Sequence, residues 1–356
     1  MVWIAFLAFV LLMLAMDLGV FHRKAHVVSL REALAWSAVW LAMGLAFTAF
    51  VYHAYESRWF GLGIAVDAVD GLPNDGAAAT EKYLTGYLVE KSLSVDNIFV
   101  IAMIFDFFAV PRLYQHRVLF WGILGALLMR GAMIALGAKL IAAFHWILYL
   151  FAIFLIVTAV KMLLLETGQA DPNRNAVVRL VRRLFPVTAR YHGEHFLVRA
   201  GAPASHESEV PGAPLVPDEV VERARPGDVL LTPLTLALVM IETTDLIFAV
   251  DSIPAIFAIT SDTFLVFTSN VFAILGLRSL YFVLAGMVKR FRYLKGALAL
   301  VLMVVGAKML LAEWLKPALG KHFNLYLLAA VIAILGAGVG GSLLSERAAG
   351  REGDPS

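Results

Sequence analysis

Five acidic residues lie inside two long apolar stretches of this sequence, residues 87–108 and 236–260. They are Glu90 and Asp96 in the first stretch, and Glu242, Asp245 and Asp251 in the second. A carboxylate in the middle of a bilayer costs about 3 kcal/mol on insertion scales, so acids in such stretches indicate a functional site. The rest of the chain is then the scaffold that must hold the two stretches against each other.

Hydroxyl and amide side chains accompany these acids at helical spacing. The supporting polar residues are Ser94, Asn97, Thr243 and Ser252. The first two follow Glu90 at i+4 and i+7, which puts all three on one helix face. Glu242 and Asp245 are three residues apart and also share a face. Such oxygen ligands suit Mg²⁺, Ca²⁺ and Mn²⁺, and the lack of Cys and of His in these stretches disfavours Zn²⁺ and Cu⁺.

Two of the acids do not fall on these faces if the helices are regular. Asp96 and Asp251 each lie six residues from an acidic neighbour, about 120° around a helix. Pro254 can kink or unwind its helix near Asp251, because proline lacks a backbone N–H. An unwound segment would also supply carbonyl ligands, as discontinuous transporter helices do.

A purely structural role for the acids is the alternative. Intramembrane acids often pair with basic side chains and hold helices together. The basic residues within reach along the sequence are Lys91, Arg130, Lys139, Lys161, Arg278 and Lys308.

Composition indicates an all-α polytopic membrane protein. Of 356 residues, 61% are hydrophobic and 16% charged, with a mean hydropathy of +0.81. A soluble protein of this length carries about 25% charged residues. The chain has no Cys, which excludes disulfides and thiolate chemistry. There is no P-loop and no set of nucleophile and oxyanion donors, so we expect no enzyme, no tightly bound cofactor and no nucleic-acid partner.

Apolar runs predict nine membrane spans. They are residues 2–20, 33–54, 83–108, 116–138, 145–165, 230–257, 264–287, 294–315 and 323–344. Basic residues are more frequent after the odd-numbered spans; for example, six Arg between Arg174 and Arg199 follow the fifth. The positive-inside rule then predicts an outside N-terminus and a cytoplasmic C-terminus, in the cell (inner or plasma) membrane.

Spans 3–5 and 6–8 resemble two copies of one unit. Matching segments follow in the same order at nearly constant offsets: DNIF and DLIF, ILG twice, and KMLLLE and KMLLAE. Because the unit has three helices, the second copy must enter the membrane from the opposite side. This inverted repeat would bring Asp96 and Asp245 together near the bilayer midplane.

The spans divide the chain into five parts. These are an N-terminal two-helix flank (1–60), the first three-helix repeat with its preceding outside loop (61–165), a partly disordered cytoplasmic loop (166–229), the second three-helix repeat (230–316), and a C-terminal helix and tail (317–356). In the outside loop we expect a solvated turn region around Asp67, Asp70 and Asp75. In the cytoplasmic loop we expect an amphipathic basic helix near 175–185, surface positions for His192 and His195, and disorder from Gly201 to Pro217.

The two acidic stretches resemble the signature helices of the TerC family of integral membrane proteins, which is associated with tellurium resistance. They read AAATEKYLTGYLVEKSLSVDNIFV and IETTDLIFAVDSIPAIFAIT, and MDLGVFHRKAHVVSLREALAWS is similar to the Alx-type members. The resemblance covers spans 1 to 8. It implies manganese(II) export from the cytoplasm. It also implies that the family's acidic motif positions correspond to Glu90, Asp96, Glu242, Asp245 and Asp251.

Three functional hypotheses follow from these patterns. The first is a secondary transporter that exports a divalent cation, Mn²⁺ by the resemblance, with or without proton coupling. The second is a membrane stress or assembly factor whose acids are structural and whose long loop binds partners. The third, an intramembrane hydrolase with an Asp pair, is the weakest because the sequence offers no matching donor set.

Overall fold

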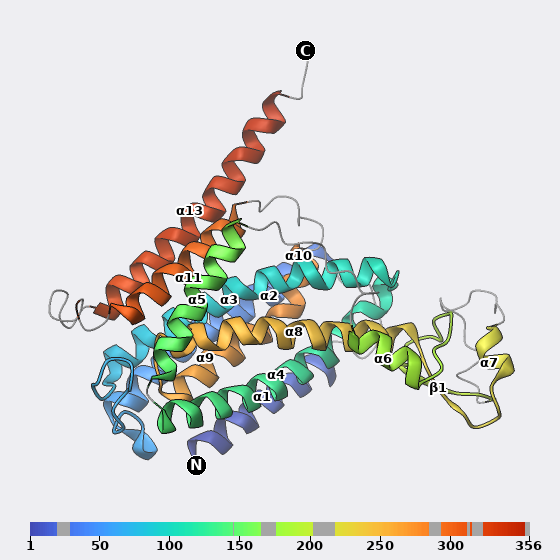
Figure 1. The fold of residues 1–356 in the computed structure, drawn as a ribbon, viewed down its shortest axis with the longest axis horizontal. Helices are drawn as coiled ribbons and strands as arrows, with labels where there is room; N and C mark the ends of the chain where they lie inside the picture. Colours follow the sequence, from blue (N-terminus) through green and yellow to red (C-terminus); the bar gives the residue numbers. More distant parts are fainter. Residues whose placement is uncertain are drawn as a thin grey trace.

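The computed structural model describes residues 1–19, 29–144, 146–164, 176–201, 218–284, 293–311, 314 and 323–352. Within these ranges the side chains of a few residues, Asp96 among them, lie outside the description. The chain is mostly helical, and its helices form an elongated bundle from which the end of α13 projects (Figure 1). The elements are α1 (Val2–Gly19), α2 (Leu30–Glu56), the 3₁₀ helix η1 (Trp59–Gly61), α3 (Gly76–Phe107), α4 (Arg112–Ala143), α5 (Ile147–Leu164), α6 (Ala176–Leu184), β1 (Leu197–Arg199), α7 (Glu219–Arg223), β2 (Val229–Leu231), α8 (Pro233–Phe257), α9 (Thr263–Leu275), α10 (Leu277–Leu284), α11 (Leu294–Leu310) and α13 (Phe323–Glu352).

Local sequence signals mark where the helices begin. Ser29, Asp75 and Asp262 precede α2, α3 and α9, and each side-chain oxygen accepts a hydrogen bond from a backbone N–H of the first turn. Pro233 is the first residue of α8, where its missing N–H costs nothing. The three side-chain caps satisfy donors that a helix leaves free, so the starts of these helices are set by local sequence.

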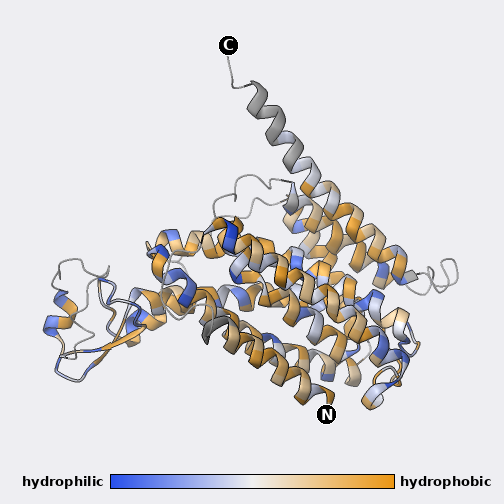
Figure 2. Cartoon of the chain, turned by 180° about the vertical axis from the view of Figure 1, so that it is seen from behind, coloured by the Kyte–Doolittle hydropathy of each residue, from blue (hydrophilic) through white to orange (hydrophobic). Residues whose placement is uncertain are grey.

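Membrane-type helices are present, as composition predicted. Within the described chain, α2, α4, α5, α8 and residues 324–342 of α13 are long and apolar enough to span a bilayer, and the bent pair α9–α10 would make a sixth. Figure 2 shows hydrophobic residues along most of the bundle helices. The other predicted spans do not meet these criteria: α3 contains six charged residues, α11 has 17 residues, and the apolar part of α1 is short.

Helices α4 and α8 pack closely and run in the same direction. A Cβ on Gly122 would meet Ile241, and a Cβ on Gly137 would meet Phe257. Residues later in α4 therefore contact residues later in α8, which shows that the helices are parallel. Helix α3 crosses α8 in the opposite direction. Asn97 bonds to Asp245, and earlier in α3 Gly86 faces Ile256 of the later part of α8.

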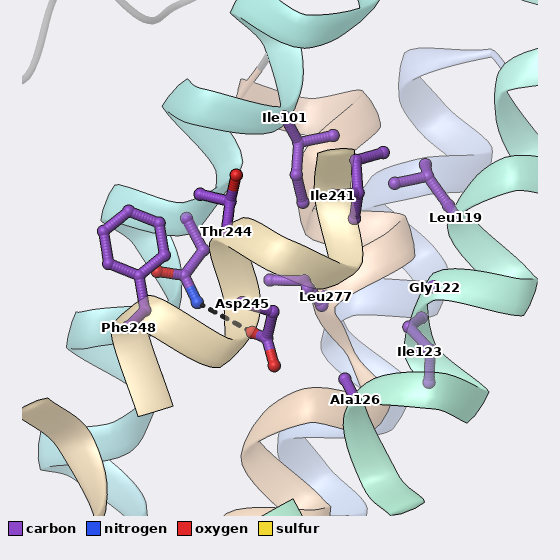
Figure 3. A pocket seen from close by; sticks show the side chains of 11 residues that line it. Ile101, Leu119, Gly122, Ile123, Ala126, Ile241, Thr244, Asp245, Phe248 and Leu277 are labelled. Atoms are coloured by element: carbon purple, nitrogen blue, oxygen red, sulfur yellow. Dashed lines mark hydrogen bonds between the residues drawn. The ribbon is translucent and has the colours of Figure 1, made fainter. Parts of the chain in front are cut away.

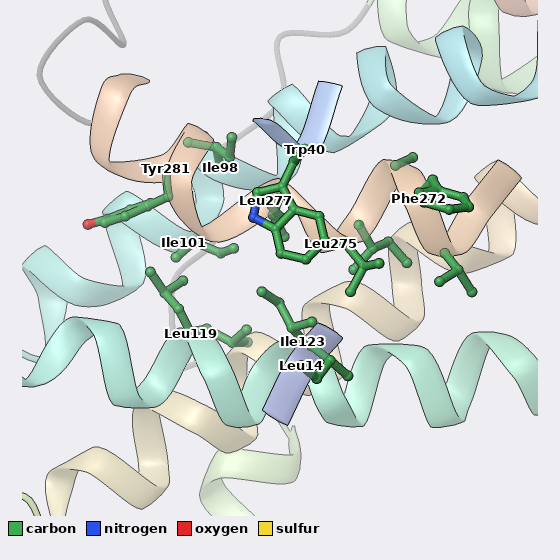
Figure 4. Close-up of a cluster of buried hydrophobic side chains, with 14 of the residues drawn as sticks. Leu14, Trp40, Ile98, Ile101, Leu119, Ile123, Phe272, Leu275, Leu277 and Tyr281 are labelled. Atoms are coloured by element: carbon green, nitrogen blue, oxygen red, sulfur yellow. The ribbon is translucent and has the colours of Figure 1, made fainter. Parts of the chain in front are cut away.

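The discontinuity in the helical core lies in a different place from the one predicted. Pro254 does not unwind α8, which stays helical to Phe257 because the proline lies in its last turn and removes only one ladder donor. The break occurs instead at Gly276, where α9 and α10 meet at an angle of 41°. Buried apolar side chains pack on both sides of the break, including Leu275, Leu277 and Trp40 of α2 (Figure 4).

The segment before α3 is a turn region with mostly exposed residues, as predicted, but Asp67 within it is buried against the bundle. Asp67 is 2% exposed, and its carboxylate accepts hydrogen bonds from Lys82, Thr260, and the backbone and side chain of Ser261. Lys82 also forms an ion pair with Asp70 at 2.6 Å. The solvated position predicted for Asp67 was wrong because its partners Thr260 and Ser261 lie 193 and 194 residues away in the chain, in the turn between α8 and α9. Asp75 is exposed, in its capping role.

The region between α5 and α8 contains a small folded unit. The predicted basic helix is α6, and β1 pairs antiparallel with β2, with Leu197 opposite Leu231. The unit is fastened to the bundle by Tyr191, whose hydroxyl donates to the Phe108 carbonyl at 2.6 Å. The surface position predicted for His192 is wrong: the ring is 3% exposed and lies 3.5 Å from Asp218, which caps α7. The segment 202–217, predicted to be disordered, lies outside the described residues.

Candidate functional site

One buried guanidinium joins the two acidic helices. Arg130 comes from the middle of α4 and its side chain is 2% exposed. It donates to Glu90 of α3, whose side chain is fully buried, and to Asp245 of α8. It also donates to the hydroxyl of Ser252, at 3.3 Å. Helices far apart in the sequence therefore meet at a single positive charge.

Asp245 is held on both of its oxygens. Nε and one terminal nitrogen of Arg130 reach the two carboxylate oxygens at 3.2 and 2.9 Å, the forked geometry typical of Arg–carboxylate pairs. The Asn97 amide donates to one of these oxygens at 3.3 Å. Asp245 is 13% exposed and lines a pocket between α3, α4 and α8, with Asn97, Thr244 and Phe248 also on its wall (Figure 3).

Glu242 lies one helical turn before Asp245, next to α4. Its carboxylate sits directly over Gly125, and a Cβ added at Gly125 would overlap it. Among the described residues, no group hydrogen-bonds to the buried Oε2 atom of Glu242, and the same holds for Oε2 of Glu90. A buried carboxylate oxygen normally finds a donor, so these two atoms need an explanation.

The formal charge of this cluster is negative. Glu90, Glu242 and Asp245 contribute three negative charges when ionised, and Arg130 contributes one positive charge, which leaves −2. An uncompensated buried charge is costly, and a hard cation is one agent that would remove it. No group of three or more His, Cys, Asp and Glu arranged to hold a metal is found in the part of the chain that the structure describes.

The structure brings together three of the five predicted acids. Asp251 turns away from them, because its position on α8 faces α5, where the Thr158 hydroxyl lies 3.5 Å from its carboxylate. The side chain of Asp96 lies outside the described residues, so its predicted meeting with Asp245 stays a prediction.

Of the predicted supporting residues, some contact the acidic cluster and others do not. Asn97 and Ser252 contact the cluster, while Thr243 bonds back to the Val239 carbonyl of its own helix. Ser94 is buried within α3.

Arg130 is the residue whose central place the sequence did not reveal. It appeared only as one of six basic side chains that could neutralise an acid. A signal was present, since Arg130 interrupts an apolar run of more than 20 residues, and a charge at that depth demands a partner. Which acid it would meet depended on helix packing.

Comparison with known proteins gives several matches over most of the chain. The model of the "Integral membrane protein TerC family" matches residues 76–349. An uncharacterized membrane protein of Myxococcus xanthus, STKORF319, is 45% identical over 347 residues, covering 97% of this chain and 92% of that protein. The Escherichia coli K12 protein Alx, described as a candidate membrane-bound redox modulator, is 40% identical over 337 residues, covering 93% of this chain and 94% of its own length. No solved structure gives a significant match.

Proposed function

Because the chain belongs to the TerC family of integral membrane proteins, we propose that it is a secondary transporter exporting divalent metal cations, above all Mn²⁺, from the cytoplasm. The observation that carries this proposal is the meeting of Glu90 and Asp245 at one buried point, with Glu242 a turn away. The cluster charge of −2 is matched by one divalent ion. Carboxylate, amide and hydroxyl oxygens are ligands suited to Mn²⁺. The choice of manganese rests on the resemblance of the two signature stretches to the family.

The proposed architecture is the inverted repeat with nine spans. Each helix of the first unit contacts its counterpart in the second: α3 with α8, α4 with α9, and α5 with α11. The exchanged pairs α3–α9 and α4–α8 are also both in contact, which a pseudo-twofold axis requires. The opposite directions of α3 and α8 support the same relation. An outside N-terminus, a cytoplasmic C-terminus and a location in the plasma membrane complete this proposal.

The name of the Escherichia coli relative suggests a second reading, a membrane factor that acts on redox state or stress. This chain has no Cys, so thiol–disulfide exchange within it cannot supply such an activity. The ion pairs of Glu90 and Asp245 with Arg130 favour the hypothesis of a membrane factor in which the acids only hold helices together. The transporter hypothesis predicts that neutralising one of these acids abolishes ion flux, and the membrane-factor hypothesis predicts no such flux to abolish.

Transport in inside-out membrane vesicles tests the proposal. We expect Mn²⁺ uptake by wild-type vesicles and its loss in Asp245→Asn, because the amide keeps the shape but removes the ligand charge. Asp106→Asn is the matched control, since Asp106 is exposed near the end of α3 and outside the cluster. Equal uptake by wild type and Asp245→Asn would refute the transport proposal. Repeating the assay under an imposed pH gradient tests whether Mn²⁺ transport is coupled to protons.

A further inference from the structure

We propose that Arg130 is the resident cation of the transport site: it holds Glu90 and Asp245 in the ion-free state, and the divalent ion binds by displacing it. This inference rests on the proposed function and adds a specific exchange partner to it. In this view Arg130 sets the affinity of the site for its substrate.

The hydrogen bonds of the cluster leave little room for a metal beside the guanidinium. Both oxygens of Asp245 and Oε1 of Glu90 accept from Arg130, and the Ser252 hydroxyl does so too. Each carboxylate oxygen keeps a further lone pair, but a cation bound there would lie next to the positive guanidinium, and the two like charges repel each other. Arg130 and the ion therefore compete for the same ligands.

The guanidinium group of an arginine keeps its positive charge in proteins. It must leave the two acids as a cation, and a buried cation needs a new partner. Glu242 offers one. Glu242 lies one turn before Asp245 on α8, and its carboxylate rests against Gly125 of α4. Its buried Oε2 atom has no hydrogen-bond donor among the described residues.

The charges balance in the state that this exchange produces. Glu90 and Asp245 with one divalent ion are neutral, and Arg130 with Glu242 is neutral. In the ion-free state, with all three carboxylates ionised, the same four groups carry a charge of −2. Arg130 is then shared by two acids, and Glu242 is in no ion pair within the described part of the chain. The arrangement is thus two positive charges short, and a monovalent ion would supply only one of them.

Metal binding to the purified protein tests the exchange, with Mn²⁺ titrated and followed by the electron paramagnetic resonance signal of the free ion. We expect Arg130→Ala to bind Mn²⁺ more tightly than wild type, by about tenfold or more, because no internal cation has to be displaced. Guanidinium chloride at concentrations that do not denature should fill the vacated position. It should then weaken Mn²⁺ binding competitively in Arg130→Ala and leave wild-type binding unchanged.

Arg130→Lys provides a second variant that keeps the buried charge. Lysine cannot hold both Asp245 oxygens in a fork, so we expect Mn²⁺ affinity between those of wild type and Arg130→Ala. If Mn²⁺ binds wild type but not Asp245→Asn, and neither Arg130 variant binds more tightly, the exchange is refuted while the transport proposal stands. If wild type and Asp245→Asn bind Mn²⁺ equally, or neither binds it, both proposals fail.

Discussion

Glu242 illustrates how a site carboxylate depends on one glycine of a neighbouring helix. Because its carboxylate lies against Gly125, the methyl group of Gly125→Ala would overlap it and push it out of place. Displacing a charged group of a functional site by about 1 Å can cost up to about 100-fold in rate. We therefore expect Gly125→Ala to lower Mn²⁺ transport in vesicles by about 10- to 100-fold.

Gly122→Ala is the matched control for this prediction. It adds the same methyl group one turn earlier in α4, where it would meet Ile241 at 3.4 Å, an ordinary van der Waals contact. We expect transport close to that of wild type. Similar losses of Mn²⁺ transport in both variants would mean that added volume in this part of α4 is itself harmful. The displacement of Glu242 would then not be the cause.

A lysine side chain lies at the break between helices α9 and α10. Lys91 of α3 donates to the Ala273 carbonyl at 3.1 Å, at the end of α9 where the helix dipole favours a cation. A Cβ on Gly276 would lie 2.7 Å from Nζ of Lys91 and 3.1 Å from Cβ of Trp40. Gly276→Ala should therefore lower the free energy of unfolding by about 1–3 kcal/mol, the usual cost of overpacking.

Thermal unfolding in detergent measures this change. Gly336→Ala in α13 is the comparison, because nothing lies within 4 Å of the Cβ it would add. There, replacing a helical glycine should raise stability by up to about 1 kcal/mol. If both variants have the same Tm, the close packing at the break is not important for stability.

At the scale of the whole molecule, a buried polar network ties distant segments together at the end of the bundle away from β1 and β2. Asp67 and Asp70 in the segment before α3 share Lys82, Asp67 bonds to the α8–α9 turn, and Asp70 receives a hydrogen bond from Asn324 of α13 at 3.5 Å. Burial alone would raise the pKa of Asp67. The Lys82 ammonium and the hydrogen bonds from Lys82, Thr260 and Ser261 outweigh it and hold this pKa well below its usual range.

This lowered pKa predicts a pH dependence of stability. A carboxyl whose pKa is lower in the folded state stabilises the fold above its unfolded pKa, about 4, and loses that contribution as pH falls further. Wild type should therefore be more stable than Asp67→Asn at pH 7, and the difference should shrink below about pH 4. Unfolding in detergent between about pH 3 and 7 measures it, and a constant difference would contradict the prediction.

Much of the candidate site could be predicted from the sequence, because a charge inside an apolar run is a local signal. The positions of Glu90, Glu242 and Asp245, the membrane class and the family all follow from residues that are neighbours in the chain. The position of Asp251 could not be predicted. Whether it faces the cluster or α5 depends on how α8 is rotated among its neighbours, and packing alone sets that rotation.

By itself the sequence determined which carboxyl groups lie inside apolar stretches and that such oxygen ligands suit a hard cation. Only the tertiary structure decided that Arg130 joins Glu90 and Asp245, partners 40 and 115 residues away, and that Asp67 is buried against a turn 193 residues away. The physical reason is that a side chain's charge and polarity belong to the residue. Its counter-charge is supplied by whichever helix packs beside it, and that choice is made by the whole bundle.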